Sequence, residues 1–259
     1  MLTAITRQVS PTINQYELSF HARQPIDVER AIDQHEAYEE CLRQLGARVV
    51  SLAPEPDLPD AVFVEDAAIV VDDVAVIPMM GAASRRPETE SLARALSVYR
   101  PLKFMQAPAT LDGGDVMRIG RRVFVGASKR TNSEGIAQLR AALVPFDYEV
   151  TAVDVKQCLH LKSGCSHVGR NSILVNRELV DVTRLAGFEL IDVPPSEADA
   201  ANALLIKDVV IVPSAFDKTI ARLEEQGFIV KAIDVSEFQK AEGGVTCKSI
   251  IFNADEPDS

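Results

Sequence analysis

One of the four cysteines in this chain has the setting of a nucleophile. Cys247 lies in the segment GGVTCKS, directly after Gly243 and Gly244, which let the backbone approach a ligand closely. A free thiol has a pKa of about 8.5, so a reactive cysteine needs a neighbouring histidine or a bound cation to favour the thiolate. The apolar neighbours Val245 and Ile250 are equally typical of a thiol that packs in the core. Cys247 is therefore a candidate nucleophile, with a core thiol as the alternative.

Four histidines are candidates for the proton carrier beside that thiol. His160 lies between two leucines in LHLKSGCS, just before a glycine, a setting that can hold an imidazole near neutrality. His35 falls on the apolar side of an expected helix and reads as a core or boundary residue. A zinc site at His160, Cys165 and His167 is a further possibility, but a fourth ligand and a closed tetrahedral pattern are missing. The sequence therefore favours His160 as acid/base and predicts no metal site.

Acidic residues gather in two short segments. PDAVFVED contributes Asp60, Glu65 and Asp66, and TLDGGD contributes Asp112 and Asp115. A guanidinium ion offers five N–H donors in one plane, which several carboxylates can accept together. A calcium or magnesium site is the alternative, but the alternating oxygen-ligand loop of such sites is absent. The acids therefore favour a planar organic cation as the ligand.

Two arginine-containing segments occupy corresponding places in the chain. Arg85 and Arg86 lie in ASRRPE, and Arg130 lies in SKRTN, each after an apolar run. Arginines at equivalent positions can bind one carboxylate from two sides. Exposure to solvent is the ordinary alternative for such residues. We expect a paired contact to a ligand carboxylate.

The composition excludes several functional classes. The chain has 259 residues, 47% of them hydrophobic and 25% charged, enough for a sizeable core. The net charge of -11 disfavours nucleic acid and anionic membranes as partners. No segment approaches the roughly 20 apolar residues that a membrane span needs. Cysteines without a CxxC pair favour reduced thiols in the cytoplasm.

A degenerate repeat must position these residues. Each copy reads as a polar residue, an apolar strand, a polar turn, a second apolar strand and a helix. If the first strands lie beside a common axis, the leading residues share one central site, because buried polar groups are costly elsewhere. Polar turn residues at strand starts are the alternative. The leading residues are Asp66, Asp115, Cys165, Asn202 and Cys247.

The repeat predicts a closed ring in one domain, residues 1–259. The last strand, SIIFN, needs a partner, which a strand at residues 2–6 supplies. In the third copy we expect the strand at residues 172–175 and a turn at Asn176–Arg177. A polar tail is expected from Asn253. Helices are expected from Asp27 to Gly46, after Pro87, from Thr131 or Asn132, and from Phe216 to Glu225, ended by Gly227.

Six segments in this order resemble the dimethylarginine dimethylaminohydrolases: LPDAVFVED, GAASRRPETE, TLDGGDV, VGASKRTN, LHLKS and GGVTCKS. The resemblance extends from Leu18 to Phe252. It implies membership of the guanidine-modifying superfamily that includes arginine deiminase. The implied fold is α/β, a five-bladed αββαβ propeller (pentein) with pseudo-fivefold symmetry and a central active site.

The resemblance also implies a role for each matching residue. Cys247 matches the nucleophile, His160 the general acid/base, and Asp112 the acid that supports the histidine. Glu65 and Asp66 match the pair that binds the guanidinium. The amino-acid end of the substrate is implied to meet Asp60, Arg85, Arg130 and the backbone carbonyls of Leu18 and Ala241.

The implied reaction converts Nω-methylated arginine and water to citrulline and a methylamine through a covalent thiouronium. It implies a small-molecule substrate, no cofactor, and a monomer or homodimer. The alternatives are an arginine deiminase, a hydrolase of another substituted guanidine, or a non-catalytic binding protein. Retention of the candidate catalytic residues argues against the last. The family reads TRPGA where this chain reads PMMGA, and Met79 in place of the arginine leaves the preferred substrate open.

Overall fold

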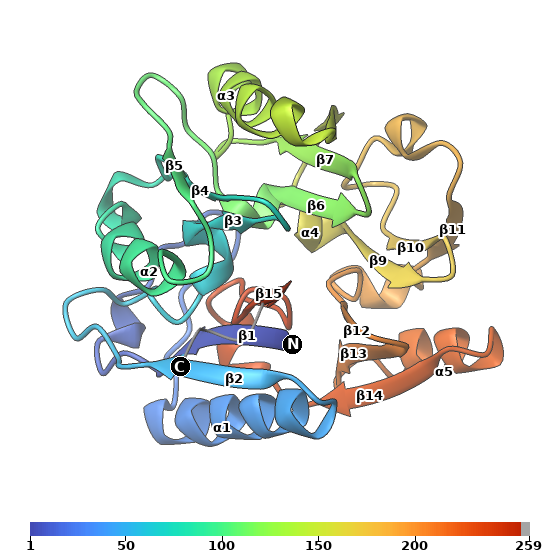
Figure 1. The fold of residues 1–259 in the computed structure, drawn as a ribbon. Helices are drawn as coiled ribbons and strands as arrows, with labels where there is room; N and C mark the ends of the chain where they lie inside the picture. Colours follow the sequence, from blue (N-terminus) through green and yellow to red (C-terminus); the bar gives the residue numbers. More distant parts are fainter. Residues whose placement is uncertain (255–259) are drawn as a thin grey trace.

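Five small sheets surround a common centre in the computed structural model, which describes residues 1–254 (Figure 1). Each sheet has three strands, and each forms one blade of a propeller. The strands are β1 Leu2–Arg7, β2 Arg48–Leu52, β3 Ile69–Val70, β4 Ala75–Ile77, β5 Leu102–Phe104, β6 Val116–Ile119, β7 Arg122–Ala127, β8 Glu149–Asp154, β9 Cys165–Gly169, β10 Ser172–Val175, β11 Glu189–Asp192, β12 Leu204–Ile206, β13 Val209–Pro213, β14 Ile229–Ile233 and β15 Ile250–Asn253.

Every blade repeats one topology. The first two strands form an antiparallel pair, and the third strand returns parallel to the second, as in β6–β7–β8. A connection between parallel strands must cross over the sheet, and in most blades a helix makes this crossover. The predicted repeat of two strands and a helix is therefore confirmed, and the third strand completes it.

The two ends of the chain close the ring. Strand β15 pairs antiparallel with β1, with Leu2 opposite Asn253 and Ile5 opposite Ile250. The backbone N–H of Ala254 donates to the carbonyl of Met1 at 2.8 Å. The predicted partner for the last strand is thus confirmed. The tail expected from Asn253 was placed wrongly at its start, since Asn253 is part of β15 and Ala254 is buried, and residues 255–259 of that tail lie outside the described residues.

The helices begin at the residues that the capping patterns indicate. The Asp27 carboxylate accepts the Arg30 N–H at the start of α1, and the Asn132 side chain accepts the Gly135 N–H at the start of α3. Gly46 and Gly227 follow α1 and α5 with positive φ, as helix ends favour. The helices are α1 Val28–Gln44, α2 Glu88–Leu96, α3 Ser133–Leu143, α4 Leu161–Gly164, α5 Asp217–Glu225 and α6 Ser236–Gln239, with 3-10 turns that include η2 Val64–Ala67, η4 Gly113–Asp115 and η6 Val182–Leu185.

The third copy of the repeat was predicted incorrectly. The segment at residues 172–175 is the second strand of its blade, and Cys165 itself begins the first strand, β9. The turn lies at Arg170–Asn171, both with positive φ, instead of at Asn176–Arg177. Strand β9 reads CSHVG, so its polar residues conceal it from a search for apolar runs. The short turn η6 replaces the helix of this blade.

Each hydrophobic cluster joins two neighbouring blades. Ile69 of β3 packs in one cluster with Val123 of β7, and Phe124 of β7 packs in another with Ile173 of β10. Three further clusters fill the other junctions of the ring. A three-stranded sheet cannot bury enough apolar surface alone, so the blades stabilise one another.

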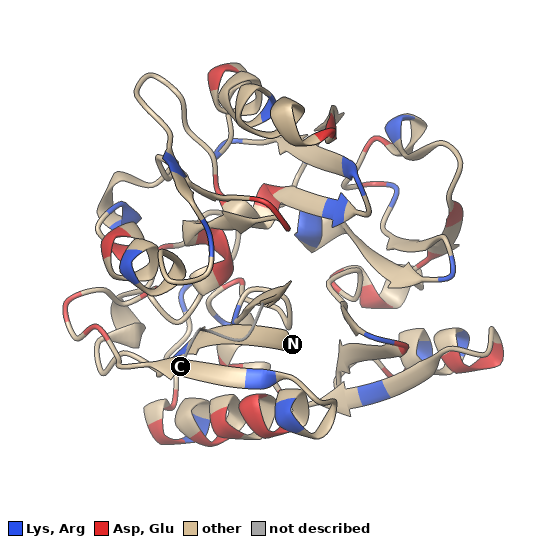
Figure 2. Cartoon of the chain, viewed as in Figure 1, with Lys and Arg blue, Asp and Glu red and all other residues tan. Residues whose placement is uncertain are grey.

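Charged residues of both signs are distributed over the helices and strands in the view of Figure 2. Figure 2 shows more acidic than basic residues along α1, and both signs on the other outer elements. Among the described residues, no helix is both long and apolar enough to span a bilayer.

We expect Leu139→Ala to destabilise the protein by about 2–5 kcal/mol, because it empties a fully buried position between α3 and its sheet. Val98→Ala is the control, since Val98 is 71% exposed. Urea unfolding followed by circular dichroism measures both. Equal unfolding midpoints for the two variants would show that this cluster does not support the ring.

Candidate active site

The residues that precede the first strand of several blades meet at the centre of the ring. Turn η2 carries Glu65 and Asp66 ahead of β3, and η4 carries Asp115 ahead of β6. His160 stands at the N-terminal cap position of α4, ahead of β9. The predicted gathering of leading polar residues is therefore observed for Asp66 and Asp115, whereas in the blade of β9 His160 takes the place of the predicted leading residue, Cys165.

The His160 imidazole lies between two carboxylates. Its Nε2 is 3.1 Å from Asp112 Oδ2, and its Nδ1 is 3.7 Å from Asp66 Oδ1. Asp115 accepts the backbone N–H of Leu161 at 2.9 Å and so anchors the start of α4 beside the ring. A Cβ at Gly114 would stand 2.5 Å from His160 Nδ1, so a glycine is required for this approach. The structure thus pairs His160 with Asp112, as the sequence led us to expect.

These carboxylates control the charge of His160. Burial opposes protonation of the ring, but Asp66, Asp112 and Asp115 outweigh it and raise the pKa of His160 to about 9. For the Asp115 carboxyl, burial acts in the opposite direction and raises the pKa to about 6, although His160 and the Ser128 and Thr131 hydroxyls oppose that rise. At neutral pH the imidazole is therefore protonated, as a proton donor must be.

Cys247 lies in the segment between α6 and β15 and lines a cavity. Its Sγ accepts the Gly244 N–H at 3.3 Å. Burial, Glu65 and Asp66 raise the pKa of Cys247 to about 12, opposed by that N–H and by Lys162. These surroundings favour the protonated thiol at neutral pH, and a nearby cation is needed to form the thiolate.

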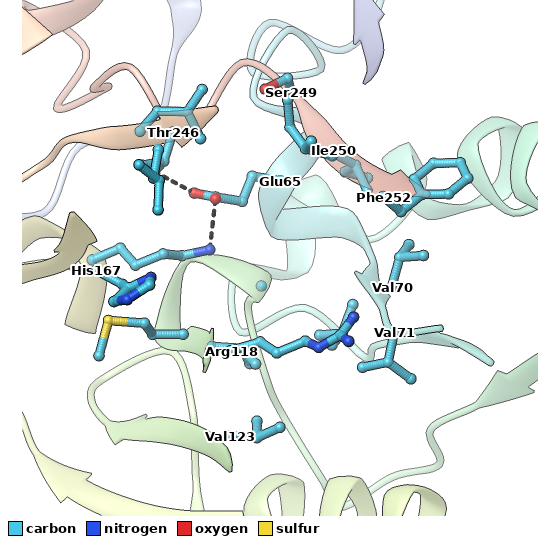
Figure 3. Close-up of a pocket in the computed structure, with 18 of the residues that line it drawn as sticks. Glu65, Val70, Val71, Arg118, Val123, His167, Thr246, Ser249, Ile250 and Phe252 are labelled. Carbon is cyan, nitrogen blue, oxygen red and sulfur yellow. Dashed lines mark hydrogen bonds and ion pairs between the residues drawn. The ribbon is translucent and has the colours of Figure 1, made fainter. Parts of the chain in front are cut away.

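Glu65 is held by a set of contacts from three other elements. Its carboxylate binds Lys162 Nζ at 2.6 Å and the Thr246 hydroxyl at 2.7 Å. Asn202 donates to Thr246 Oγ1 at 3.0 Å and to the carbonyl of Lys162 at 2.9 Å. Figure 3 shows Glu65 between Thr246 and the ammonium group that it binds. Burial raises the pKa of Glu65, and Lys162 opposes that rise.

These contacts separate two cavities. The larger, of about 420 Å³, is lined by Glu65, Lys162 and Thr246. The smaller, of about 200 Å³, is lined by Cys247 and Asn202, together with Phe20 and other residues of the N-terminal loop. Because the nucleophile candidate lines the smaller cavity, that cavity is the candidate substrate pocket, although the other is roomier.

Asp66 and Arg85 form a buried ion pair. Arg85 Nη1 lies 2.7 Å from Asp66 Oδ2, and Arg85 Nη2 lies 2.9 Å from Glu88 Oε2. His160 and Arg85 lower the pKa of Asp66 against the effect of burial. Arg85 was expected to contact a ligand carboxylate, but a ligand would here compete with Asp66 and Glu88 for the guanidinium.

Arg130 has a donor that these pairs leave free. Its side chain is 10% exposed, and Nη1 has no hydrogen-bond partner within residues 1–254. Nη1 lies 3.7 Å from Asp112 Oδ2, and Nη2 donates to Ser19 Oγ at 3.3 Å. The structure therefore places Arg130 in reach of both the His160–Asp112 pair and the N-terminal loop.

The remaining predicted residues lie on the loop side of the site. Asp60 is buried and accepts the backbone N–H of Glu17 at 3.0 Å. Leu18 and Ala241 pack in one hydrophobic cluster, and Cys247 packs against the same cluster. All ten predicted site residues thus fall within one region of the ring, though only some of them touch.

Among the remaining expectations for individual residues, the one for Cys165 is wrong and the one for His35 agrees with the structure. Cys165 does not face the centre, because it is fully buried in the hydrophobic cluster of its own blade. Met79 packs between blades, beside β3 and β6. His35 is buried beside Tyr38, in agreement with a core role. In the described part of the chain, no group of three histidine, cysteine or acidic side chains has a geometry that could hold a metal.

Two residues of this site were not singled out by sequence reasoning. Glu88 follows Arg85 by three positions, a spacing that brings side chains together at a helix start. Lys162 follows His160 by two positions, in the same short segment LHLKS. The pairing of Glu88 with Arg85 could be read from their spacing in the sequence. The pairing of Lys162 with Glu65 could not, because it depends on how the ring brings two blades together.

The five-bladed ring and its central acid, imidazole and thiol groups define the chain as a pentein. The family model described as eukaryotic N,N dimethylarginine dimethylhydrolase matches residues 4–252. The N(G),N(G)-dimethylarginine dimethylaminohydrolase of Streptomyces coelicolor is 36% identical, over 95% of this chain and 95% of that protein. The enzyme of the same name from Pseudomonas aeruginosa is 34% identical, over 90% of this chain and 92% of that protein.

A solved structure agrees with these sequence matches. It is the Pseudomonas aeruginosa protein as a cysteine-to-serine variant in complex with citrulline, with a TM-score of 0.92 and 31% identity. The match covers 97% of this chain and 100% of that chain. This chain belongs to the dimethylarginine dimethylaminohydrolase family.

The charges around Cys247 predict how its thiol reacts. Alkylation of Cys247 by iodoacetamide should rise about tenfold per pH unit between pH 7 and 9, because the thiolate fraction rises in that proportion below the pKa. Glu65→Gln should raise the rate at pH 8 several-fold, since it removes a neighbouring negative charge. Mass spectrometry of the Cys247 peptide measures both, with Glu40→Gln as an exposed control. A rate that levels off below pH 9 would contradict this charge balance.

Proposed function

We propose that this protein hydrolyses Nω-methylated arginine to citrulline and a methylamine. The chain is a hydrolase of C–N bonds in linear amidines, as its family membership shows. The observation that carries the proposal is the His160 imidazole held between Asp66 and Asp112, in a ring centre whose smaller cavity is lined by Cys247. The citrulline in the related structure is the product that this reaction would leave.

The substrate itself activates the nucleophile in this proposal. A guanidinium beside Glu65 and Asp66 neutralises the two carboxylates that raise the pKa of Cys247. Its positive charge also favours the thiolate directly. The thiol proton then leaves to solvent, because His160 already carries its own proton, and the reactive thiolate forms only where a cation has bound.

The chemistry follows from the two proposed catalytic groups. The Cys247 thiolate attacks the guanidinium carbon and forms a neutral tetrahedral adduct. His160 gives its proton to the methylated nitrogen, and the C–N bond breaks to release the methylamine and leave an S-linked thiouronium. The neutral imidazole then takes a proton from water, and the resulting hydroxide attacks the same carbon. Collapse of this second adduct breaks the C–S bond, the sulfur leaves as the thiolate, and the hydroxyl proton passes to the released methylamine, which gives citrulline and leaves His160 protonated for the next cycle.

Asp112 is proposed to orient the imidazole and to stabilise its protonated form. Its Oδ1 accepts the Gly81 N–H at 2.8 Å, so the carboxylate is fixed before His160 binds it. Such fixed partners keep a general acid in place through the reaction. Asp66 serves both His160 and the guanidinium, and Arg85 holds Asp66 in its ionised form.

The amino-acid end of the substrate is proposed to lie toward the N-terminal loop. Arg130 provides a donor for the carboxylate, while Arg85 contributes indirectly through Asp66 unless it exchanges partners. Asp60 and the carbonyls of Leu18 and Ala241 would accept from the α-amino group. Because every proposed residue belongs to one chain, the site is complete in a monomer and equally in a homodimer.

The cellular setting is proposed from the same chemistry. All four cysteines are free in the structure, and a thiol nucleophile needs a reducing compartment such as the cytoplasm. Cys247 and His160 together supply nucleophile, acid and base, so the proposed reaction requires no cofactor. The implied partner is the small-molecule substrate alone.

Citrulline formation from dimethylarginine, monomethylarginine and arginine tests the proposal. We expect the two methylated substrates to dominate, and Cys247→Ser to lower turnover at least about 10³-fold while the protein stays folded. Cys158→Ser is the matched control, because Cys158 lines the same cavity. A dominant rate with unmethylated arginine would instead indicate a deiminase.

The raised pKa of His160 predicts the alkaline limb of the pH profile. Turnover should fall above about pH 9, where the imidazole loses the proton that it gives to the leaving amine. Asp112→Asn should move this limb to lower pH, because the carboxylate that stabilises the imidazolium is removed. Initial rates from pH 6 to 10.5 measure the shift. An unchanged limb in this variant would remove Asp112 from its proposed role.

A further inference from the structure

One carboxylate holds the tip of the N-terminal loop. Glu242 Oε1 accepts the backbone N–H groups of Phe20 and His21, each at 2.6 Å. The Ser19 N–H donates to both carboxylate oxygens, at 3.3 and 3.2 Å. Residues 16–27 form neither helix nor strand, so their amides depend on contacts of this kind. Three consecutive amides on one carboxylate make a specific clamp.

The backbone of Glu242 has an unusual conformation that aims this carboxylate. It follows α6 with a φ of 59°, in the left-handed region where helix ends favour glycine. The next N–H, of Gly243, reaches back to the carbonyl of Phe238 at 2.9 Å and fixes the turn. A non-glycine residue in this region is strained and often functional. Glu242, Gly243, Gly244 and Cys247 line the same small cavity.

The loop is also tied to residues already assigned to the substrate. The Glu17 N–H donates to Asp60, and the Ser19 hydroxyl accepts from Arg130. Leu18 lies between these two contacts, and Ala241 precedes Glu242 in the chain. The clamp therefore joins the segments that carry both expected carbonyl acceptors, those of Leu18 and Ala241.

We propose that Glu242 is a positioning residue that fixes the Leu18 and Ala241 carbonyls as one binding site for the α-amino group of the substrate. This inference rests on the proposed function for its substrate class. Glu242 neither touches the reacting carbon nor moves a proton. It determines selectivity for amino acids over guanidines that lack the amine, because two carbonyls bind one ammonium well only at a fixed separation.

Binding measurements separate this inference from turnover. In the Cys247→Ser background, titration calorimetry compares dimethylarginine with its deamino analogue, Nω-dimethylated 5-guanidinopentanoate. Adding Glu242→Ala should weaken dimethylarginine binding about tenfold and analogue binding less than about twofold, because only the first carries the ammonium. Equal losses for the two compounds, or no loss for either, would overturn the proposal. Glu178→Ala is the matched control, an exposed glutamate that lines the same cavity.

Hydrogen exchange tests the clamp without any ligand. The peptide containing Ser19, Phe20 and His21 should exchange faster in Glu242→Ala than in wild type, with other peptides unchanged. Glu242→Asp, which keeps the charge with a shorter reach, should give an intermediate rate and shows the effect if the alanine variant folds poorly. Unchanged exchange in both variants would overturn the clamp. Absence of citrulline formation with the binding selectivity intact would refute the proposed function and leave this inference standing.

Discussion

Buried carboxylates at the centre of the ring must be paired across blades, and the rest of the site depends on this requirement. An isolated ionised acid in the interior is prohibitively costly, so each needs a cation or several donors. Asp66 is met by Arg85 and His160, and Glu65 is met by Lys162. The contacts of Asp66 with His160 and of Glu65 with Lys162 link different blades, whereas Asp66 and Arg85 belong to the same blade. The ring is held together at its centre by the same charges that serve the proposed chemistry.

These carboxylates also set the protonation states of the two proposed catalytic groups. His160 carries a proton at neutral pH, whereas Cys247 keeps its own. Since folding raises the pKa of His160 above its ordinary value of 6.5, the imidazolium stabilises the fold fully below about pH 6.5 and loses that effect as the pH rises through about 9. In the proposed mechanism, a bound guanidinium is the additional cation that converts the Cys247 thiol to its thiolate.

The five blades share a topology but not their contributions. The blades led by Asp66 and Asp115 supply acids, and the blade led by Cys247 supplies the thiol. The blade that begins at Cys165 has lost its helix to η6, and its leading cysteine packs in the core. The segment just before that blade supplies His160 and Lys162 instead. The repeated topology therefore determines where polar side chains can meet, whereas the type of side chain at that position differs from blade to blade.

The sequence by itself determined the repeat of paired strands and helices, the closure of the ring and the family, and it named the candidate residues of the site. Local patterns, such as the caps at Asp27 and Asn132 and the paired runs after Asp66 and Asp115, act over a few residues and are readable one at a time. The matching motifs identified the family, and the catalytic roles of Cys247, His160 and Asp112 stay predictions. The short polar strand β9 was missed because its residues carry no apolar alternation. Only the tertiary structure decided the long-range partners: Arg85 with Asp66, Lys162 with Glu65, and Glu242 with the loop at Ser19–His21. Side-chain pairing across a closed ring depends on distances between blades, and no local pattern in the chain encodes those distances.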